Sequence, residues 1–174
     1  IFGNYEINKN RKKLNENNDK VFIKIISPNF DLEYGLTKKQ IKERFNRLVR
    51  YSNPKKGEKT LFIWPEGVFS GYSYDEVITF KELILKNFSK EHTIIFGINQ
   101  LDPKSGNYYN SMLVVDNNFK IIQSYNKRKL VPFGEFLPFE NFLNKFGFKK
   151  ITEGHGSFLR GIKNNNIFIE KINF

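Results

Sequence analysis

The chain has 174 residues, of which 39% are hydrophobic; this is enough for one domain with a sizeable core and excludes a disordered chain. The formal net charge of +11 attracts anions of any kind, but the sequence has no RNA-binding signature and no zinc-finger spacing. The absence of Cys excludes disulfides, zinc–thiolate sites and a thiol nucleophile within these 174 residues.

The N-terminal part of the chain predicts a linker, a strand and a helix. Residues 1–20 are polar and rich in Asn, Lys and Glu, which is typical of a linker. Residues 21–27 (VFIKIIS) are apolar and β-branched, which predicts a buried strand. Thr37 and Gln40 form a capping-box pattern at the start of a helix, and Asn53-Pro54 ends it. The apolar residues between these signals follow one helix face: Ile41, Phe45, Leu48 and Val49.

The middle of the chain alternates between strands and a helix and then forms a hairpin. Residues 60–64 (TLFIW) and 93–98 (TIIFGI) are short apolar runs that predict buried strands. Residues 75–88 between them have helical spacing of their apolar side chains. Residues 109–115 and 120–125 flank an Asp-Asn-Asn turn, which predicts two hairpin strands.

The remaining sequence predicts a loop over residues 127–138, a short helix over residues 139–146 and a last strand over residues 167–172. Alternating strands and helices favour a layered α/β fold, and the hairpin makes its sheet mixed. No apolar run approaches the roughly 20 residues needed to span a bilayer.

Glu66 is the first candidate for acid–base chemistry because it directly follows the predicted strand 60–64. In α/β sheets, reactive groups collect where strands end and loops begin. Pro65 ends the strand, and Gly67 permits an unusual backbone conformation beside the carboxylate. An exposed loop Glu without a function is the alternative interpretation.

Lys127 and Glu135 are two further candidates in the loop after the hairpin. A lysine that emerges from a buried strand can stabilise a developing oxyanion, although Lys127 is also one Lys among many in a basic chain. Glu135 is the one carboxylate in an otherwise apolar segment, residues 130–138 (LVPFGEFLP). Such surroundings raise a carboxyl pKa and suit acid–base catalysis; a hydrogen-bonded structural Glu is the equal alternative.

Other catalytic classes find little support in the sequence. His92 and His155 have no metal-ligand spacing and lie beside no candidate nucleophilic Ser. Ser111 lacks the Gly-x-Ser-x-Gly elbow of many serine hydrolases. There is no phosphate-binding glycine loop, so we expect no cofactor.

Together, these segments resemble the nitrilase superfamily of carbon–nitrogen hydrolases, which uses a Glu-Lys-Cys triad. Phe62-Ile63-Trp64-Pro65-Glu66 resembles the segment around its Glu, and Tyr125-Asn126-Lys127 the segment around its Lys. Residues 125–138 (YNKRKLVPFGEFLP) are more specific and resemble the signature of the apolipoprotein N-acyltransferase family. The resemblance runs from about residue 21 to the end, so residues 21–174 are identified as a partial nitrilase-like domain.

The resemblance implies a four-layer αββα sandwich with mixed sheets, incomplete at its C-terminus. It implies a domain on the periplasmic side of the bacterial inner membrane. The family transfers an acyl chain from a phospholipid to the amino group of the diacylglyceryl-cysteine of apolipoproteins, through a Cys thioester. By motif position, Glu66 would be the general base, Lys127 the oxyanion stabiliser and Glu135 an additional essential carboxylate.

The missing nucleophile is the main departure from the family pattern. The family's Cys follows the strand that corresponds to residues 167–172, whereas this sequence ends at Phe174. We therefore expect these 174 residues to be inactive alone and to reach the membrane through segments outside them. The expected partners are a phospholipid acyl donor and diacylglyceryl-modified apolipoproteins, with no nucleic acid, and the expected state is a monomer.

Two alternatives to the acyltransferase remain. The first is a soluble carbon–nitrogen hydrolase of the same superfamily, against which the segment Leu-Val-Pro-Phe-Gly-Glu argues. The second is a non-catalytic remnant whose basic surface binds anionic lipid or nucleic acid. The +11 charge and the absence of Cys favour this second alternative.

Overall fold

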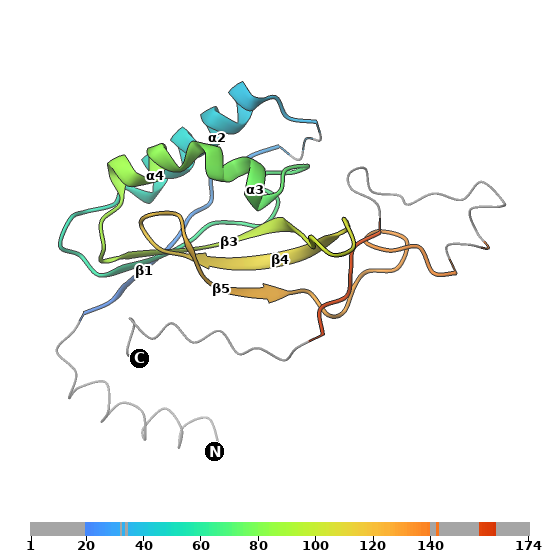
Figure 1. The fold of residues 1–174 in the computed structure, drawn as a ribbon. Coiled ribbons are helices and arrows are strands. Elements are labelled where there is room, and N and C mark those ends of the chain that lie inside the picture. The colour runs from blue at the N-terminus through green and yellow to red at the C-terminus, as the bar shows by residue number, and fades with distance from the viewer. Residues whose placement is uncertain (1–19, 32, 34, 140–141, 143–156, 163–174) are drawn as a thin grey trace, which may run out of the picture.

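The computed structural model describes residues 20–31, 33, 35–139, 142 and 157–162, and its centre is one mixed β-sheet (Figure 1). Its five strands lie side by side in chain order: β1 (Phe22–Ile25), β2 (Thr60–Ile63), β3 (His92–Leu101), β4 (Tyr108–Val115) and β5 (Ile121–Asn126). The first three strands are parallel, and β4 and β5 are antiparallel to their neighbours. This confirms the predicted mixed sheet and its hairpin.

The helices lie on one face of this sheet (Figure 1). The longest is α2 (Lys38–Ser52), which begins at the predicted capping box. The Gln40 N–H donates to Thr37 Oγ1 at 3.3 Å, and the Thr37 N–H donates to Gln40 Oε1 at 2.9 Å. The helix ends at Asn53, whose left-handed backbone (φ 42°) lets the chain turn towards β2.

The predicted helix over residues 75–88 is wrong as a single helix. The structure has α3 (Tyr74–Val77), a 3₁₀ turn (Ile78–Phe80) and α4 (Lys81–Asn87). The hydroxyl of Thr79 donates to the Glu76 carbonyl at 2.8 Å at the point where the helix breaks. Such local bonds offer the backbone an alternative to the α-helical pattern, which apolar spacing alone does not reveal.

An aromatic cluster forms the core between the helices and the sheet. Phe45 of α2 is fully buried and stacks on Phe69 with ring centroids 4.5 Å apart. Trp64 and Phe119 meet Phe45 edge-on at 6.2 and 5.8 Å. Because Phe69 and Trp64 flank the loop of Glu66, this cluster fixes the start and end of that loop.

The predicted strand over residues 21–27 exists, but the prediction that it is buried is wrong. Phe22, Ile23 and Ile25 of β1 are 44%, 54% and 78% exposed. Among the described residues, the strand lies at the edge of the sheet and pairs only with β2. An apolar run can therefore mark an edge strand as well as an inner one.

The described residues make up one helical layer and one sheet layer of the expected four-layer sandwich. The predicted helix over residues 139–146 and the strand over residues 167–172 lie outside the described residues, apart from Phe139 and Phe142. Within the described part of the chain, no helix has the length and apolar character needed to cross a membrane.

Candidate active site

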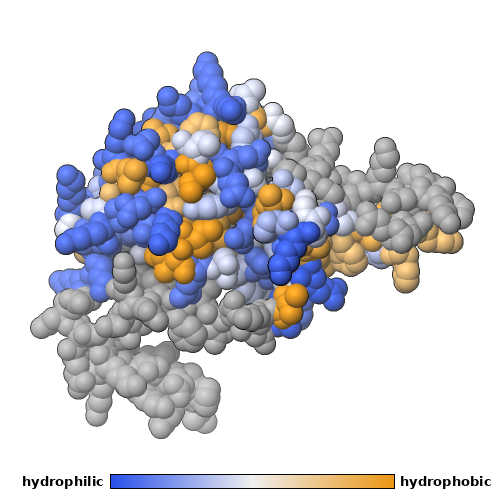
Figure 2. Space-filling model, viewed as in Figure 1, coloured by the Kyte–Doolittle hydropathy of each residue, from blue (hydrophilic) through white to orange (hydrophobic). Residues whose placement is uncertain are grey.

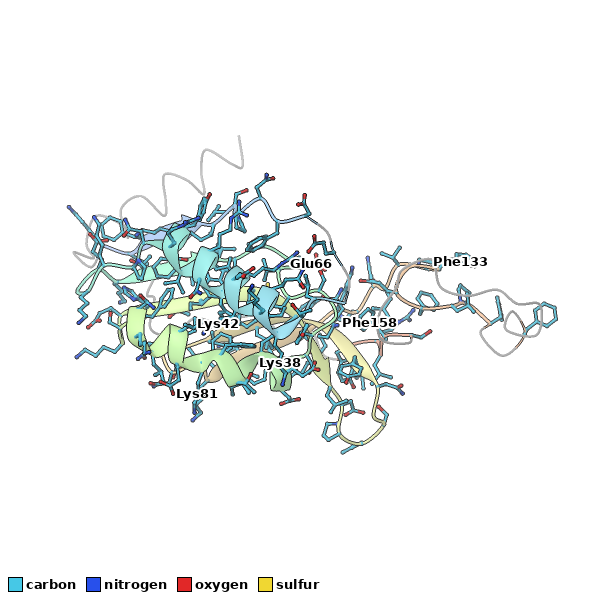
Figure 3. All side chains as sticks on the ribbon, turned by 90° about the horizontal axis from the view of Figure 1, so that it is seen from above. Lys38, Lys42, Glu66, Lys81, Phe133 and Phe158 are labelled. Carbon is cyan, nitrogen blue, oxygen red and sulfur yellow. The ribbon has the colours of Figure 1, made fainter. Side chains whose placement is uncertain are left out.

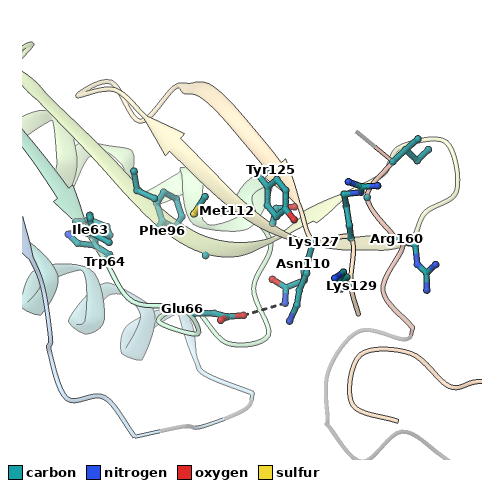
Figure 4. A pocket seen from close by; sticks show the side chains of 16 residues that line it. Ile63, Trp64, Glu66, Phe96, Asn110, Met112, Tyr125, Lys127, Lys129 and Arg160 are labelled. Carbon is teal, nitrogen blue, oxygen red and sulfur yellow. Dashed lines mark hydrogen bonds between the residues drawn. The ribbon is translucent and has the colours of Figure 1, made fainter. Parts of the chain in front are cut away.

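Hydrogen bonds bring the three predicted residues together where strands of the sheet end. Figure 4 shows two of them, Glu66 and Lys127. Glu66 lies in the loop that follows β2, and Lys127 directly follows β5. The Lys127 N–H donates to the Asn110 carbonyl at 2.8 Å, which continues the hydrogen-bond pattern between β4 and β5. Lys127 is therefore held beside Asn110, a residue of β4.

Hydrogen bonds join the two carboxylates, the lysine and an amide into one network. Asn110 Nδ2 donates to Glu135 Oε1 at 2.7 Å and to Glu66 Oε1 at 3.3 Å. Lys127 Nζ lies 2.9 Å from the same Glu135 oxygen. The structure thus brings Glu66, Lys127 and Glu135 together, with Asn110 between the two carboxylates.

Gly97 of β3 allows Glu66 to approach the sheet. A Cβ atom at Gly97 would lie 3.2 Å from Cγ and 3.3 Å from Cα of Glu66, which is too close without a shift of Glu66. The Trp64 N–H donates to the Ile95 carbonyl at 2.8 Å and fixes the chain just before this contact. The loop after β2 is therefore seated directly on β3.

The loop of residues 131–137 folds back on itself and presents the Glu135 carboxylate. The Glu135 N–H donates to the Val131 carbonyl at 2.8 Å, and the Val131 N–H donates to Glu135 Oε2 at 2.8 Å. Phe133, with φ 63°, forms the turn, and its N–H donates to the Phe136 carbonyl at 2.7 Å. This reciprocal bonding fixes the side chain that accepts from Lys127.

Glu135 is an ionised acceptor. Burial of this side chain, which is 13% exposed, works to raise its pKa. Hydrogen bonds from Lys127, the Val131 amide and Asn110 outweigh burial and leave the pKa of Glu135 below its ordinary value. The interpretation of Glu135 as an acid of raised pKa is therefore wrong, and that of a hydrogen-bonded carboxylate holds.

The pKa shift of Glu135 predicts a pH-dependent stability effect of Glu135→Gln. A carboxyl whose pKa is lower in the folded state stabilises fully above its unfolded pKa, about 4.3. That contribution is lost as the pH falls through the folded pKa. We therefore expect the full-length Gln variant to melt below wild type by a constant margin between about pH 6 and 8. The margin should shrink below about pH 4.

Thermal unfolding across this pH range measures the effect, with Glu82→Gln, a change of an exposed carboxylate on α4, as the control. A margin for the Glu135 variant that widens towards low pH would contradict the ionised state of Glu135.

Residues 157–161 bind the separate parts of the site together and are called the clip below. The Phe158 N–H donates to the Glu135 carbonyl at 2.8 Å, and the Leu159 N–H donates to the Tyr108 carbonyl at 2.8 Å. The Gly161 N–H donates to the Lys127 carbonyl at 3.0 Å. The clip therefore touches the backbone at Glu135, at Lys127 and at the start of β4.

Sequence reasoning did not assign a role to Asn110 or to the clip. A signal for Asn110 was available: it is a side-chain amide at the start of a strand that continues as the apolar run 112–115. The clip left no such signal, because its contacts to Glu135, Tyr108 and Lys127 are made by backbone amides. Backbone donors carry no residue-type information.

A cavity of about 1050 Å³ lies beside these residues and has two chemically different parts (Figure 4). Apolar side chains of the sheet line one part: Ile63, Ile95, Phe96 and Met112. Cationic side chains line the other part: Lys127, Arg128, Lys129 and Arg160. Glu66 and Asn110 lie between them, so a proton acceptor and a cation face the same space.

A mixed α/β sheet with acid–base groups gathered at its strand ends is the architecture of an α/β enzyme site. The chain belongs to the carbon–nitrogen hydrolase family, whose model matches residues 30–163. This confirms the resemblance to the nitrilase superfamily that the sequence motifs indicated.

Two curated relatives show which members of this family the chain is similar to. The chain is 30% identical over 161 residues to an apolipoprotein N-acyltransferase of Rhodopseudomonas palustris, covering 86% of this chain and 30% of that protein. It is 34% identical over 109 residues to an apolipoprotein N-acyltransferase of Bradyrhizobium diazoefficiens, covering 60% of this chain and 20% of that protein. The chain thus spans less than a third of the length of these relatives.

Solved structures support the fold. An amidase from Nesterenkonia sp. superposes with a TM-score of 0.52 at 13% identity, covering 86% of this chain and 51% of that one. The predicted nitrilase-like α/β fold is thereby confirmed.

Proposed function

We propose that the protein containing this chain is an apolipoprotein N-acyltransferase at the periplasmic side of the bacterial inner membrane. It transfers a fatty acyl chain from a phospholipid to the N-terminal amine of diacylglyceryl-cysteine in apolipoproteins. The observation that carries the proposal is the Lys127–Glu135 ion pair of 2.9 Å, which lies within the motif similar to that family. The names of the curated relatives support the same reaction.

The first half-reaction forms a thioester on a cysteine from outside these 174 residues, which contain none. Glu66 accepts the thiol proton, and the thiolate attacks the ester carbonyl carbon of the phospholipid. The tetrahedral oxyanion accepts a hydrogen bond from Lys127 Nζ. Collapse of this intermediate breaks the ester C–O bond, and the leaving lysophospholipid oxygen takes the proton back from Glu66.

The second half-reaction moves the acyl group to the apolipoprotein. The neutral amine of its N-terminal cysteine attacks the thioester carbonyl, and Lys127 again stabilises the oxyanion. Glu66 accepts a proton from the attacking nitrogen as the C–S bond breaks, and this proton returns to the departing sulfur. The products are an amide and the free thiol, so Glu66 ends in its starting state.

Glu135 and Asn110 orient the groups that react. Glu135 accepts from Lys127, which fixes the ammonium at one position and leaves its remaining donor directions for an oxyanion. Asn110 donates to both carboxylates and so sets the position of Glu66 relative to Glu135. The ionised state of Glu135 suits this role, because a neutral carboxyl would hold the lysine less firmly.

Exposed apolar side chains on the loop of Glu135 and just after it suit a substrate that resides in a bilayer. Val131, Phe133 and Phe139 are 52%, 44% and 84% exposed, and Phe142 is 61% exposed. Figure 3 shows Phe133 on a loop that protrudes from the body of the sheet and helices, and apolar surface is visible in the same region of Figure 2. Clustered exposed apolar side chains usually mark an interaction surface.

The exposed loop predicts that Phe133→Ser with Phe139→Ser lowers the transfer rate more for phospholipid in vesicles than for the same phospholipid in detergent micelles. Burial of each Phe in lipid is worth about 1.5–3 kcal/mol, so we expect at least a ~10-fold loss on vesicles. Leu85→Ser is the matched control, because Leu85 is an exposed apolar residue of α4 on the helical face. Equal losses on vesicles and micelles would contradict a membrane contact by this loop.

The proposed reaction is tested with the full-length protein in vesicles that contain phospholipid labelled in its acyl chain. We expect label to appear in an amide at the N-terminus of an added diacylglyceryl-cysteine peptide, and Glu66→Gln to leave only a small residual rate of this transfer. Hydrolysis of soluble amides without transfer to the peptide would instead establish the carbon–nitrogen hydrolase. Salt-sensitive binding to anionic vesicles without either reaction would establish the non-catalytic alternative.

A further inference from the structure

We propose that Arg44, a buried residue of α2, is a positioning residue that holds the loop of Glu66 against the loop that follows β1. The inference rests on the proposed role of Glu66 as the general base. Arg44 is 7% exposed and lies on the helix face that also carries Ile41, Phe45 and Leu48.

The guanidinium of Arg44 bridges the two loops. Its Nη1 donates to the Val68 carbonyl at 3.2 Å, two residues after Glu66. Its Nη2 donates to the Asp31 carbonyl at 2.9 Å, in the loop that follows β1. One planar guanidinium group therefore joins two backbone segments that belong to different strand ends.

The surroundings of Arg44 are unfavourable for a charge unless its hydrogen bonds are made. A buried charge costs free energy when it is unpaired, and a leucine at this position of an apolar helix face would avoid that cost. The nearest carboxylate, Glu33 Oε2, lies 3.4 Å away on a side chain that is 50% exposed, so solvent weakens this ion pair. The two carbonyls are therefore the main partners of the buried cation.

The two bridged loops form the walls of a small pocket beside Glu66. The pocket has a volume of about 210 Å³ and is lined by residues 27–31 of one loop and residues 65–68 of the other. Arg44 bonds to a carbonyl in each wall. Arg44 therefore sets the separation of the two walls. Through its bond to Val68 it also sets the position of the backbone that carries the Glu66 side chain.

Arg47, one turn further along α2, is a matched comparison within the same helix. Both guanidinium groups lie over the ring of Phe30, Arg44 at 4.8 Å and Arg47 at 5.3 Å from its centroid. Arg47 Nε is buried without a hydrogen-bond partner in the described part of the chain. Arg47 thus shares the helix and the aromatic contact of Arg44, and the two loop carbonyls distinguish them.

The test compares Arg44→Lys with Arg47→Lys in the full-length protein. A lysine keeps the charge but presents a point-like ammonium that does not span both carbonyls with a planar fork. We expect Arg44→Lys to lower kcat by about 10-fold through misplacement of Glu66, with KM changed less than about 2-fold. Arg47→Lys should leave kcat unchanged.

A double-mutant cycle separates positioning from general destabilisation. If Arg44 acts through Glu66, Arg44→Lys should lower the residual rate of Glu66→Gln by less than about 2-fold. A loss that is equal in the presence and absence of Glu66, or equal in the Arg44 and Arg47 variants, would overturn the inference.

Hydrogen exchange gives a result that does not depend on the reaction. Arg44→Lys should speed amide exchange in residues 29–33 and 66–70 by about 10-fold or more, whereas Arg47→Lys should not. If wild type transfers no acyl group, the proposed function fails, but this exchange pattern still supports the bridge. Unchanged exchange in both loops would overturn the bridge even if wild type is active.

Discussion

Lys127→Ala in the full-length protein should lower kcat for acyl transfer by about 10²–10³-fold, the usual cost of losing one donor to an oxyanion. Lys127 Nζ lies 2.9 Å from Glu135 and lines the cavity that Glu66 also faces. The substitution removes the cation that stabilises the negative charge developing on the carbonyl oxygen in both half-reactions. KM should change little, because the oxyanion forms only in the transition state.

Lys129→Ala is the matched control for this prediction. Lys129 is two residues away, is exposed and lines the same cavity. The loss of net charge is the same in both variants, so a general electrostatic effect on an anionic substrate would reduce both rates equally. Equal losses would contradict a specific role of Lys127, whereas a loss confined to Lys127→Ala supports it.

The sequence predicted the parts of the fold that depend on local residue type. The capping box of Thr37 and Gln40 is formed as expected, and the helix it starts ends at Asn53. The short apolar runs at residues 60–64 and 93–98 became β2 and β3, although β3 is longer than predicted. Capping and strand patterns depend on a few neighbouring residues, so they can be predicted from the sequence alone.

The sequence could not predict the features that depend on contacts between distant segments. Whether the apolar residues of β1 are buried depends on its place at the sheet edge, which no local pattern encodes. The charge state of Glu135 could not be predicted, because the apolar neighbours in the sequence indicate burial but do not show which hydrogen-bond donors reach the carboxylate. Two of its donors, Lys127 and Asn110, lie 8 and 25 positions away, and together with the Val131 amide they outweigh burial and lower the pKa of Glu135.

Positions near strand ends and a sequence motif predicted three candidate residues: Glu66, Lys127 and Glu135. The structure places them in one hydrogen-bond network. The sequence did not predict which contacts hold these three residues together. Gly97 lets Glu66 approach β3, and the clip joins Lys127 to Glu135 through backbone bonds. The role of a glycine or of a backbone amide depends on the atoms that lie opposite it in the fold, and the sequence does not show which atoms these are.

Gly161→Ala should therefore damage the site even though Gly161 has no side chain to take part in chemistry. An ideal Cβ atom at this position would overlap the Asn126 carbonyl oxygen and would lie 2.8 Å from the Asn126 carbonyl carbon. Both contacts are with backbone, which cannot rotate away as a side chain can. The clip must shift, and its bond from the Gly161 N–H to the Lys127 carbonyl is the first to be lost.

We expect Gly161→Ala to cost about 1–3 kcal/mol of stability through overpacking. It should also lower kcat by roughly 10²-fold, because a displacement near 1 Å of Lys127 is enough for such a loss. Gly134→Ala is the control: a Cβ there would meet Val131 Cγ1 at 3.5 Å, an ordinary contact, in the same loop system. The melting temperature and the kcat of the two full-length variants test this prediction. If Gly161→Ala melts and turns over like wild type, the clip does not position Lys127, and the β4–β5 hydrogen bonds alone must hold it.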